Sequence, residues 1–131
     1  TISRSTSTSR SGIEALLGRA RDSGMGLGVL SDYPPQAKLE HLALSSYFDV
    51  VVSAQEVGVF KPHPRGIEVA LERLGVSPAE ALYVGDRAEV DAAAARAAGV
   101  PCAILTQTPP PGPHDYRAVA DFAALHALLF D

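Results

Sequence analysis

The chain has 131 residues, a formal net charge of −4, 47% hydrophobic residues and 20% charged residues. These values are typical of one globular domain and exclude a disordered or fibrous chain. The acidic balance argues against nucleic acid as a partner, because that binding needs clustered Lys and Arg. No apolar run approaches the roughly 20 residues that cross a bilayer, so no membrane partner is expected. The single Cys102 leaves no internal disulfide, which predicts a reducing, cytoplasmic location.

The first eleven residues, TISRSTSTSRS, contain one apolar side chain, that of Ile2. This composition predicts a flexible arm. From Gly12 to Asp131 helical and strand periodicities alternate, which is typical of β-α units around a mostly parallel sheet. We therefore expect an N-terminal arm over 1–11 and a single domain over 12–131.

The first part of that domain is expected to contain two helices and two strands. A helix over 12–23 carries apolar residues at every third or fourth position. The apolar run 26–31 predicts a buried strand, after which Pro34 or Pro35 can begin a second helix. The three valines within 49–53 predict the next strand.

The second part is expected to add two more strands. Helical spacing of apolar residues predicts a helix over 64–74, and the segment 81–85 predicts the third strand. A stripe of small apolar side chains predicts a helix that ends at Gly99, before a fourth strand at 103–106. A proline-rich loop then leads to a last helix that Asp121 caps.

Polar residues follow several of these strands. Ser31 and Asp32 end the first strand, Asp86 ends the third, and Lys61 belongs to the loop after the second. Ligands of open parallel sheets bind beyond the carboxyl ends of the strands, so these side chains are expected to converge. Neighbouring strand residues point to opposite faces, which leaves Ser31 without an activating base and favours a phosphate-binding hydroxyl.

Two carboxylates and a lysine are the strongest candidates for chemistry. Asp86 and Asp91 suit Mg²⁺, which needs only one or two protein carboxylates besides water and substrate oxygens. The alternative is that Asp86 makes a turn and Asp91 caps a helix. Lys61 lies next to a proline and suits a phosphoryl oxygen or a carboxylate, although a lone lysine is also typical of a solvated surface. We interpret His63 as a turn residue and Cys102 as a packed thiol.

The segments GLGVLSD, VFKPHP and YVGDRAEVDAAAARAAGVP resemble motifs II, III and IV of the haloacid dehalogenase (HAD) superfamily, in that order. The resemblance covers about 12–131. It implies an α/β fold, a three-layer Rossmann-like, mostly parallel sheet with helices on both faces. It also implies a Mg²⁺-dependent phosphohydrolase similar to phosphoglycolate phosphatases, acting on a small phosphorylated metabolite.

The same resemblance implies a role for each motif residue. Ser31 would bind the transferring phosphoryl group, together with Asp32, which stands where Asn is common in the family. Lys61 would neutralise that group and orient the nucleophile. Asp86 would ligate Mg²⁺, and Asp91 would support the metal site.

The first motif of the family, DxDx[TV], does not occur in these 131 residues. In the family it supplies the nucleophile and the general acid/base from a central strand, and a cap domain often follows it. We therefore expect a truncated core that does not hydrolyse phosphate esters by itself. The alternatives are a non-catalytic module that binds phosphate or Mg²⁺ or a partner and, among enzymes, a haloacid dehalogenase.

Loss of that central strand would leave the segments 26–30 and 82–84 without a shared neighbour. Buried, unpaired strand edges are costly, so something is expected to fill the gap. Residues 1–9 could supply a substitute strand, another chain could donate one, as a homo-oligomer or a complementing partner, or the sheet could close differently. We expect the arm or a partner to fill the gap.

Overall fold

The computed structural model of the protein describes residues 2–3, 13–31, 47–59, 61–112 and 114–130. In these ranges the strands form one six-stranded sheet in the order β3-β2-β1-β4-β5-β6. Each neighbouring pair is parallel, as the β-α alternation predicts. The strands are β1 (Ile2–Ser3), β2 (Gly28–Ser31), β3 (Val50–Ser53), β4 (Tyr83–Gly85), β5 (Cys102–Leu105) and β6 (Arg117–Val119).

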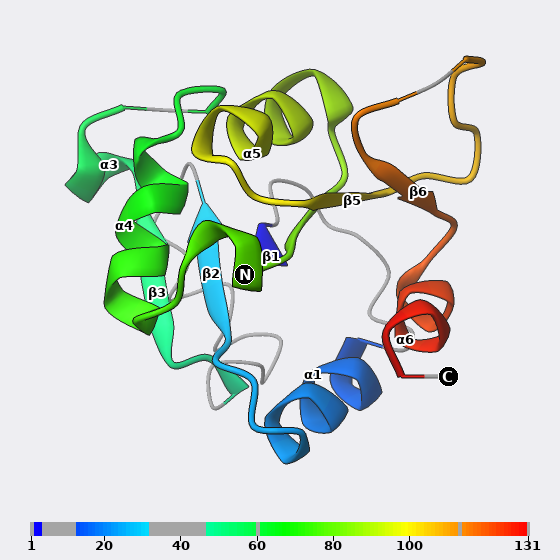
Figure 1. Ribbon diagram of the computed structural model, residues 1–131, viewed down its shortest axis with the longest axis horizontal. Coiled ribbons are helices and arrows are strands. Elements are labelled where there is room, and N and C mark those ends of the chain that lie inside the picture. The colour runs from blue at the N-terminus through cyan, green and yellow to red at the C-terminus, as the bar shows by residue number, and fades with distance from the viewer. Residues whose placement is uncertain (1, 4–12, 32–46, 60, 113, 131) are drawn as a thin grey trace.

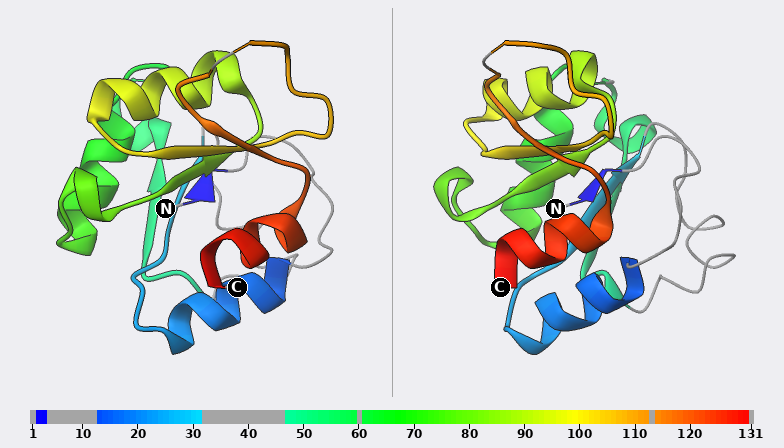
Figure 2. Two further views of the ribbon diagram at one scale, coloured as in Figure 1. Left: turned by 45° about the vertical axis from the view of Figure 1, so that its right-hand side comes forward. Right: turned by 90° about the vertical axis from the view of Figure 1, so that its right-hand side faces the viewer.

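Helices cover both faces of this sheet and complete a three-layer α/β fold (Figures 1 and 2). Helices α1 and α6 lie on one face, and α4 and α5 lie on the other. The helical elements of the described ranges are α1 (Ile13–Asp22), α3 (Ala54–Val57), α4 (Arg65–Leu74), the 3₁₀ turn η2 (Pro78–Glu80), the π-helical turn η3 (Ala88–Ala92), α5 (Ala93–Ala98) and α6 (Phe122–Phe130). None of these helices has the length and apolar character that would cross a membrane.

The sheet separates two apolar clusters. On the α1 and α6 face the buried residues include Leu17, Val29 and Leu125. On the α4 and α5 face they include Val52 and Ile67, together with small alanines of α5 that let this helix lie close to the strands. Burial of both faces explains why the strands are short apolar runs without polar alternation.

The N-terminal residues form the central strand of the sheet. Ile2 pairs with Val29 of β2 and with Val84 of β4, and Ser3 pairs with Leu30. Strands β2 and β4 therefore share β1 as their neighbour, which is the first of the three arrangements considered for the gap. The remainder of the arm, residue 1 and residues 4–11, lies outside the described residues.

Several expected elements differ from the observed ones. The first expected strand begins at Gly28 instead of residue 26, and the helix before Gly99 starts as the π-helical turn η3. Strand β6 was not predicted, because three residues are too few to display a strand period. The helix expected from Pro34 or Pro35 lies outside the described residues.

Candidate functional site

The candidate residues lie at the carboxyl edge of the sheet. Ser31 is the last residue of β2 and pairs with Ser53, the last residue of β3. Asp86 directly follows Gly85, the last residue of β4, and is half-buried. The parallel arrangement thus brings the ends of three strands to one edge, as the sequence predicts. Asp32 lies outside the described residues.

A buried ion pair lies at this edge. The Lys61 Nζ lies 2.8 Å from Asp91 Oδ1, and the two side chains are 2% and 1% exposed. Lys61 belongs to the loop before α4, and Asp91 belongs to η3, so the fold joins residues that are 30 positions apart. Charges this deeply buried require a partner, because each one loses its hydration.

The carboxylate of Asp91 also holds the turn that follows β4. Its Oδ2 accepts hydrogen bonds from the backbone N–H groups of Asp86, at 3.2 Å, and Arg87, at 3.0 Å. Its Oδ1 accepts from the hydroxyl of Tyr83, at 3.4 Å, as well as from Lys61. A carboxylate has about four lone-pair positions, and these contacts use them. Asp91 therefore fixes the position of the Lys61 ammonium and the conformation of the turn that carries Asp86.

Gly85 is required by this close approach. A Cβ built at Gly85 would lie 2.6 Å from the Cβ of Asp91 and 2.5 Å from its Cγ. The carboxylate therefore packs directly against the backbone of the strand end. The alternative interpretation of Asp91 as a helix cap describes part of its role. Arg87 is the N-cap residue of η3 and Asp91 lies within that turn, but its carboxylate accepts from the backbone N–H of Arg87.

Asp86 and Asp91 differ in how each could contribute to a Mg²⁺ site. Mg²⁺ retains several waters and needs one or two protein carboxylates, and Asp86 could provide one of them. The oxygens of Asp91 are engaged with Lys61, Tyr83 and the backbone, which favours a supporting position for it. Within the described residues no group of three or more His, Cys, Asp or Glu side chains could hold a metal by itself. An ion held at Asp86 would therefore take its remaining ligands from water and substrate.

Two other candidates have structural roles. The Nδ1 of His63 accepts a hydrogen bond from the backbone N–H of Arg65, at 3.1 Å, as a turn residue does. Cys102 is buried, and its burial, with smaller contributions from the charges of Asp91 and Asp115, raises its pKa to about 12. At neutral pH this thiol is protonated and packs as an apolar side chain.

Sequence reasoning missed Tyr83, which it placed within a strand without a further role. The side chain is fully buried, and its hydroxyl contacts Asp91. A signal was available, because a tyrosine in a buried strand needs a hydrogen-bond partner for its hydroxyl. The sequence does not identify which residue supplies that partner.

Two curated relatives are phosphatases. The chain is 41% identical over 90 residues to phosphoserine phosphatase of Thermus thermophilus, covering 66% of this chain and 36% of that protein. It is 36% identical over 97 residues to phosphoglycolate phosphatase of Yersinia pestis, covering 72% of this chain and 41% of that protein. The chain therefore spans well under half the length of these relatives.

Solved structures share the fold. The HAD phosphatase from Thermococcus onnurineus superposes with a TM-score of 0.83 at 28% identity, covering 92% of this chain and 57% of that chain. A HAD-superfamily hydrolase from Geobacter sulfurreducens gives a TM-score of 0.76 at 34% identity, covering 90% of this chain and 59% of that chain. The family profile described as haloacid dehalogenase-like hydrolase matches residues 2–99. On the profile match, and in keeping with the three-layer parallel sheet, the chain belongs to the haloacid dehalogenase-like hydrolase family.

Proposed function

We propose that this chain is the phosphate-binding and Mg²⁺-binding portion of a HAD-type phosphatase core. The parent activity is hydrolysis of a small phosphate monoester through an aspartyl-phosphate, which this chain does not complete alone. The observation that carries the proposal is the buried Lys61–Asp91 pair, 2.8 Å apart, at the edge where β2 and β4 end. The similarity to curated phosphatases supports the same activity.

The cation of Lys61 provides the electrostatic part of this function. A fixed positive charge in a water-poor site stabilises negative charge on a phosphoryl group better than a solvated one does. Asp91 holds the ammonium in place, so little reorganisation is needed when the phosphoryl group binds. The hydroxyl of Ser31, from the end of β2, is proposed to bind a phosphoryl oxygen.

Asp86 is proposed as the carboxylate that holds Mg²⁺. When bound, the ion would supply Lewis-acid polarisation of the phosphoryl oxygens. Asp91 contributes indirectly, since it fixes the backbone N–H groups of Asp86 and Arg87 and thereby the direction of the turn. These hydrogen bonds order the turn at Asp86 and Arg87 before an ion binds, which reduces the entropic cost of binding Mg²⁺.

The missing step is the covalent one. An aspartyl-phosphate needs a carboxylate nucleophile, and the sequence contains no DxDx[TV] motif to supply it. The central strand β1 consists of Ile2–Ser3 and carries no carboxylate. A haloacid dehalogenase also needs an aspartate nucleophile but no metal. The two carboxylates of the segment 85–91, Asp86 and Asp91, therefore favour the phosphatase.

The experiment is a pair of measurements on the purified chain. Hydrolysis of 4-nitrophenyl phosphate is expected to equal the buffer blank with and without Mg²⁺. In ¹H–¹⁵N spectra, Mg²⁺ and inorganic phosphate are expected to shift the amide signals of Asp86 and Arg87. Asp86→Ala should abolish the Mg²⁺ shifts, whereas Asp22→Ala, an exposed change on α1, should leave them unchanged.

Each result decides a separate part of the proposal. Mg²⁺-dependent hydrolysis that disappears in Asp86→Ala would show that the chain is catalytic by itself. Absence of any shift with either ion would contradict the binding function and leave an interaction module. Release of halide from a 2-haloacid without metal would favour the dehalogenase.

A further inference from the structure

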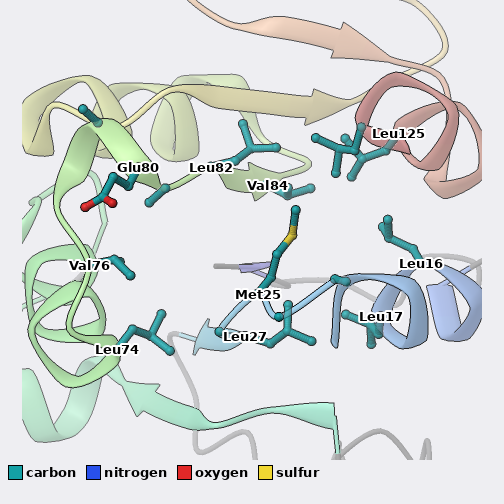
Figure 3. A pocket seen from close by; sticks show the side chains of 16 residues that line it. Leu16, Leu17, Met25, Leu27, Leu74, Val76, Glu80, Leu82, Val84 and Leu125 are labelled. Atoms are coloured by element: carbon teal, nitrogen blue, oxygen red, sulfur yellow. The ribbon is translucent and has the colours of Figure 1, made fainter. Parts of the chain in front are cut away.

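Tyr83, the first residue of β4, points away from both of its neighbours in the chain. Leu82 and Val84 line an apolar cavity and pack with the cluster of α1 and α6 (Figure 3). Successive side chains of a strand point to opposite faces of the sheet, so the ring of Tyr83 belongs to the cluster of α4 and α5. The strand therefore places a fully buried phenol on the face that carries Lys61 and Asp91.

The two oxygens of the Asp91 carboxylate hold different partners. Oδ2 accepts hydrogen bonds from the backbone N–H groups of Asp86 and Arg87. Oδ1 lies 2.8 Å from the Nζ of Lys61 and 3.4 Å from the hydroxyl of Tyr83. One oxygen therefore orders the turn proposed for Mg²⁺, and the other orders the ammonium proposed for the phosphoryl group.

The hydroxyl of Tyr83 acts on Lys61 through the oxygen that they share. A phenol that donates its proton to Oδ1 takes up part of the negative charge of that oxygen, which leaves more of the ammonium's charge for a phosphoryl group. A fixed Oδ1 also fixes the direction of the ammonium, because a lysine side chain is flexible and its donors rotate. Both effects bear on the binding of an anion by Lys61.

We propose that Tyr83 is a positioning residue for phosphate binding, whose hydroxyl holds Oδ1 of Asp91 so that the ammonium of Lys61 faces the phosphoryl group. The inference rests on the proposed function, since it concerns how Lys61 binds phosphate. It also separates the two ions, because Tyr83 contacts Oδ1, whereas Oδ2 holds the turn at Asp86. Loss of the hydroxyl should therefore weaken phosphate binding and leave Mg²⁺ binding unchanged.

The test is Tyr83→Phe, which removes the hydroxyl and keeps the ring in its buried space. Dissociation constants are measured by ¹H–¹⁵N titration of the chain with inorganic phosphate and, separately, with Mg²⁺. The constant for phosphate is expected to rise about threefold to tenfold, which corresponds to one hydrogen bond, and the constant for Mg²⁺ should not change.

The matched control is Tyr116→Phe. Tyr116 is half-buried, packs against the same cluster of α4 and α5, and stacks on the ring of His114. This change also removes one phenol hydroxyl, but away from Asp91, so neither dissociation constant should change.

A second protein tests the hydroxyl without removing it. 3-Fluorotyrosine in place of Tyr83 keeps the ring and the hydroxyl and makes the hydroxyl more acidic, which makes it a stronger donor to Asp91. Phosphate is therefore expected to bind this protein at least as tightly as the wild type. Weaker phosphate binding by the fluorinated protein would overturn the inference, whether or not Tyr83→Phe folds.

The remaining outcomes distinguish this inference from the proposed function. Equal phosphate constants for the wild type and Tyr83→Phe would overturn the inference and leave the proposed function standing. A parallel loss of phosphate and Mg²⁺ binding in Tyr83→Phe would also overturn it, because that result indicates a structural role. Absence of phosphate binding by the wild type would contradict the proposed function, and the inference with it.

Discussion

At the scale of single residues, the candidate site depends on how closely Asp91 approaches its neighbours. One carboxylate accepts hydrogen bonds from Lys61, Tyr83 and two backbone N–H groups, and it occupies the space that a Cβ at Gly85 would take. A buried carboxylate is tolerated only when its hydrogen bonds are satisfied, so each partner is expected to matter for stability as well as for binding.

Gly85→Ala is expected to disrupt this arrangement. The added Cβ would overlap the carboxylate of Asp91, so the strand end or η3 must move, at a cost of about 2 kcal/mol or more. The matched control is Gly18→Ala within α1, where no atom beyond the neighbouring residues and the helix's own backbone lies within 4 Å of the new Cβ. That change should raise stability by up to about 1 kcal/mol through helix propensity. Urea unfolding of both variants checks the prediction, and similar values for the two would contradict it.

Lys61→Met is expected to lower the free energy of unfolding by about 3 kcal/mol, because it leaves the Asp91 carboxylate buried without its cation. Asp91→Asn should also be destabilising. The double variant should cost less than the sum of the two single changes, since neither charge is then left alone. A double-mutant cycle from urea titrations measures this coupling. If the losses in unfolding free energy of the two single variants add up to that of the double variant, the two side chains are not coupled and the prediction is wrong.

At the scale of elements, the amino ends of β2 and β3 are joined by Asp49. Its backbone N–H donates to the carbonyl of Leu27, at 2.7 Å, and its Oδ2 accepts from the N–H of Leu27, at 2.9 Å. Arg21 at the end of α1 contacts Oδ1 of Asp49, at 3.3 Å. One exposed carboxylate thus connects a helix end with two strands that enter the sheet.

The stability contributed by Asp49 is expected to depend on pH. The hydrogen bond from the N–H of Leu27, with a smaller contribution from Arg21, holds the pKa of Asp49 below its ordinary value of 3.8. A carboxyl whose pKa is lower in the folded state stabilises the fold above the unfolded pKa and loses that effect as pH falls through the folded pKa. Urea midpoints of the wild type and Asp49→Asn should therefore differ most above pH 5 and converge on acidification. A difference that stays constant with pH would contradict this.

At the scale of the whole molecule, the sheet is a partition between two apolar clusters. Ile13 of α1 and Ile67 of α4 are both fully buried, one on each face. Both clusters pack against the same strands, so we expect the two faces of the domain to unfold together in one transition.

Ile13→Val and Ile67→Val are expected to cost about 1 kcal/mol each, because each removes one buried methylene. Their effects should add within about 0.5 kcal/mol in the double variant, since the residues belong to clusters on opposite faces of the sheet. Urea unfolding followed by circular dichroism and by tyrosine fluorescence measures both the sum and the number of transitions. Two separate transitions, or strong coupling, would contradict a single cooperative unit with two independent faces.

Much of the fold could be predicted from local patterns. Helix stops at Gly75 and Gly99 have left-handed φ values of 72° and 76°, as expected for residues that end helices. The placement of Ser31 and Asp86 at one edge followed from the rule that parallel strands end together. These features depend on a few neighbouring residues, and for that reason a single sequence reveals them.

The sequence by itself determined the family, the β-α alternation, and the residue types that gather at the carboxyl edge of the sheet. Only the tertiary structure decided that Lys61 pairs with Asp91, that Tyr83 joins them, and that Ile2–Ser3 forms the central strand. A two-residue strand has no periodicity, and its position follows from the need of β2 and β4 for backbone partners. An ion pair across 30 residues likewise depends on burial, which the whole fold creates.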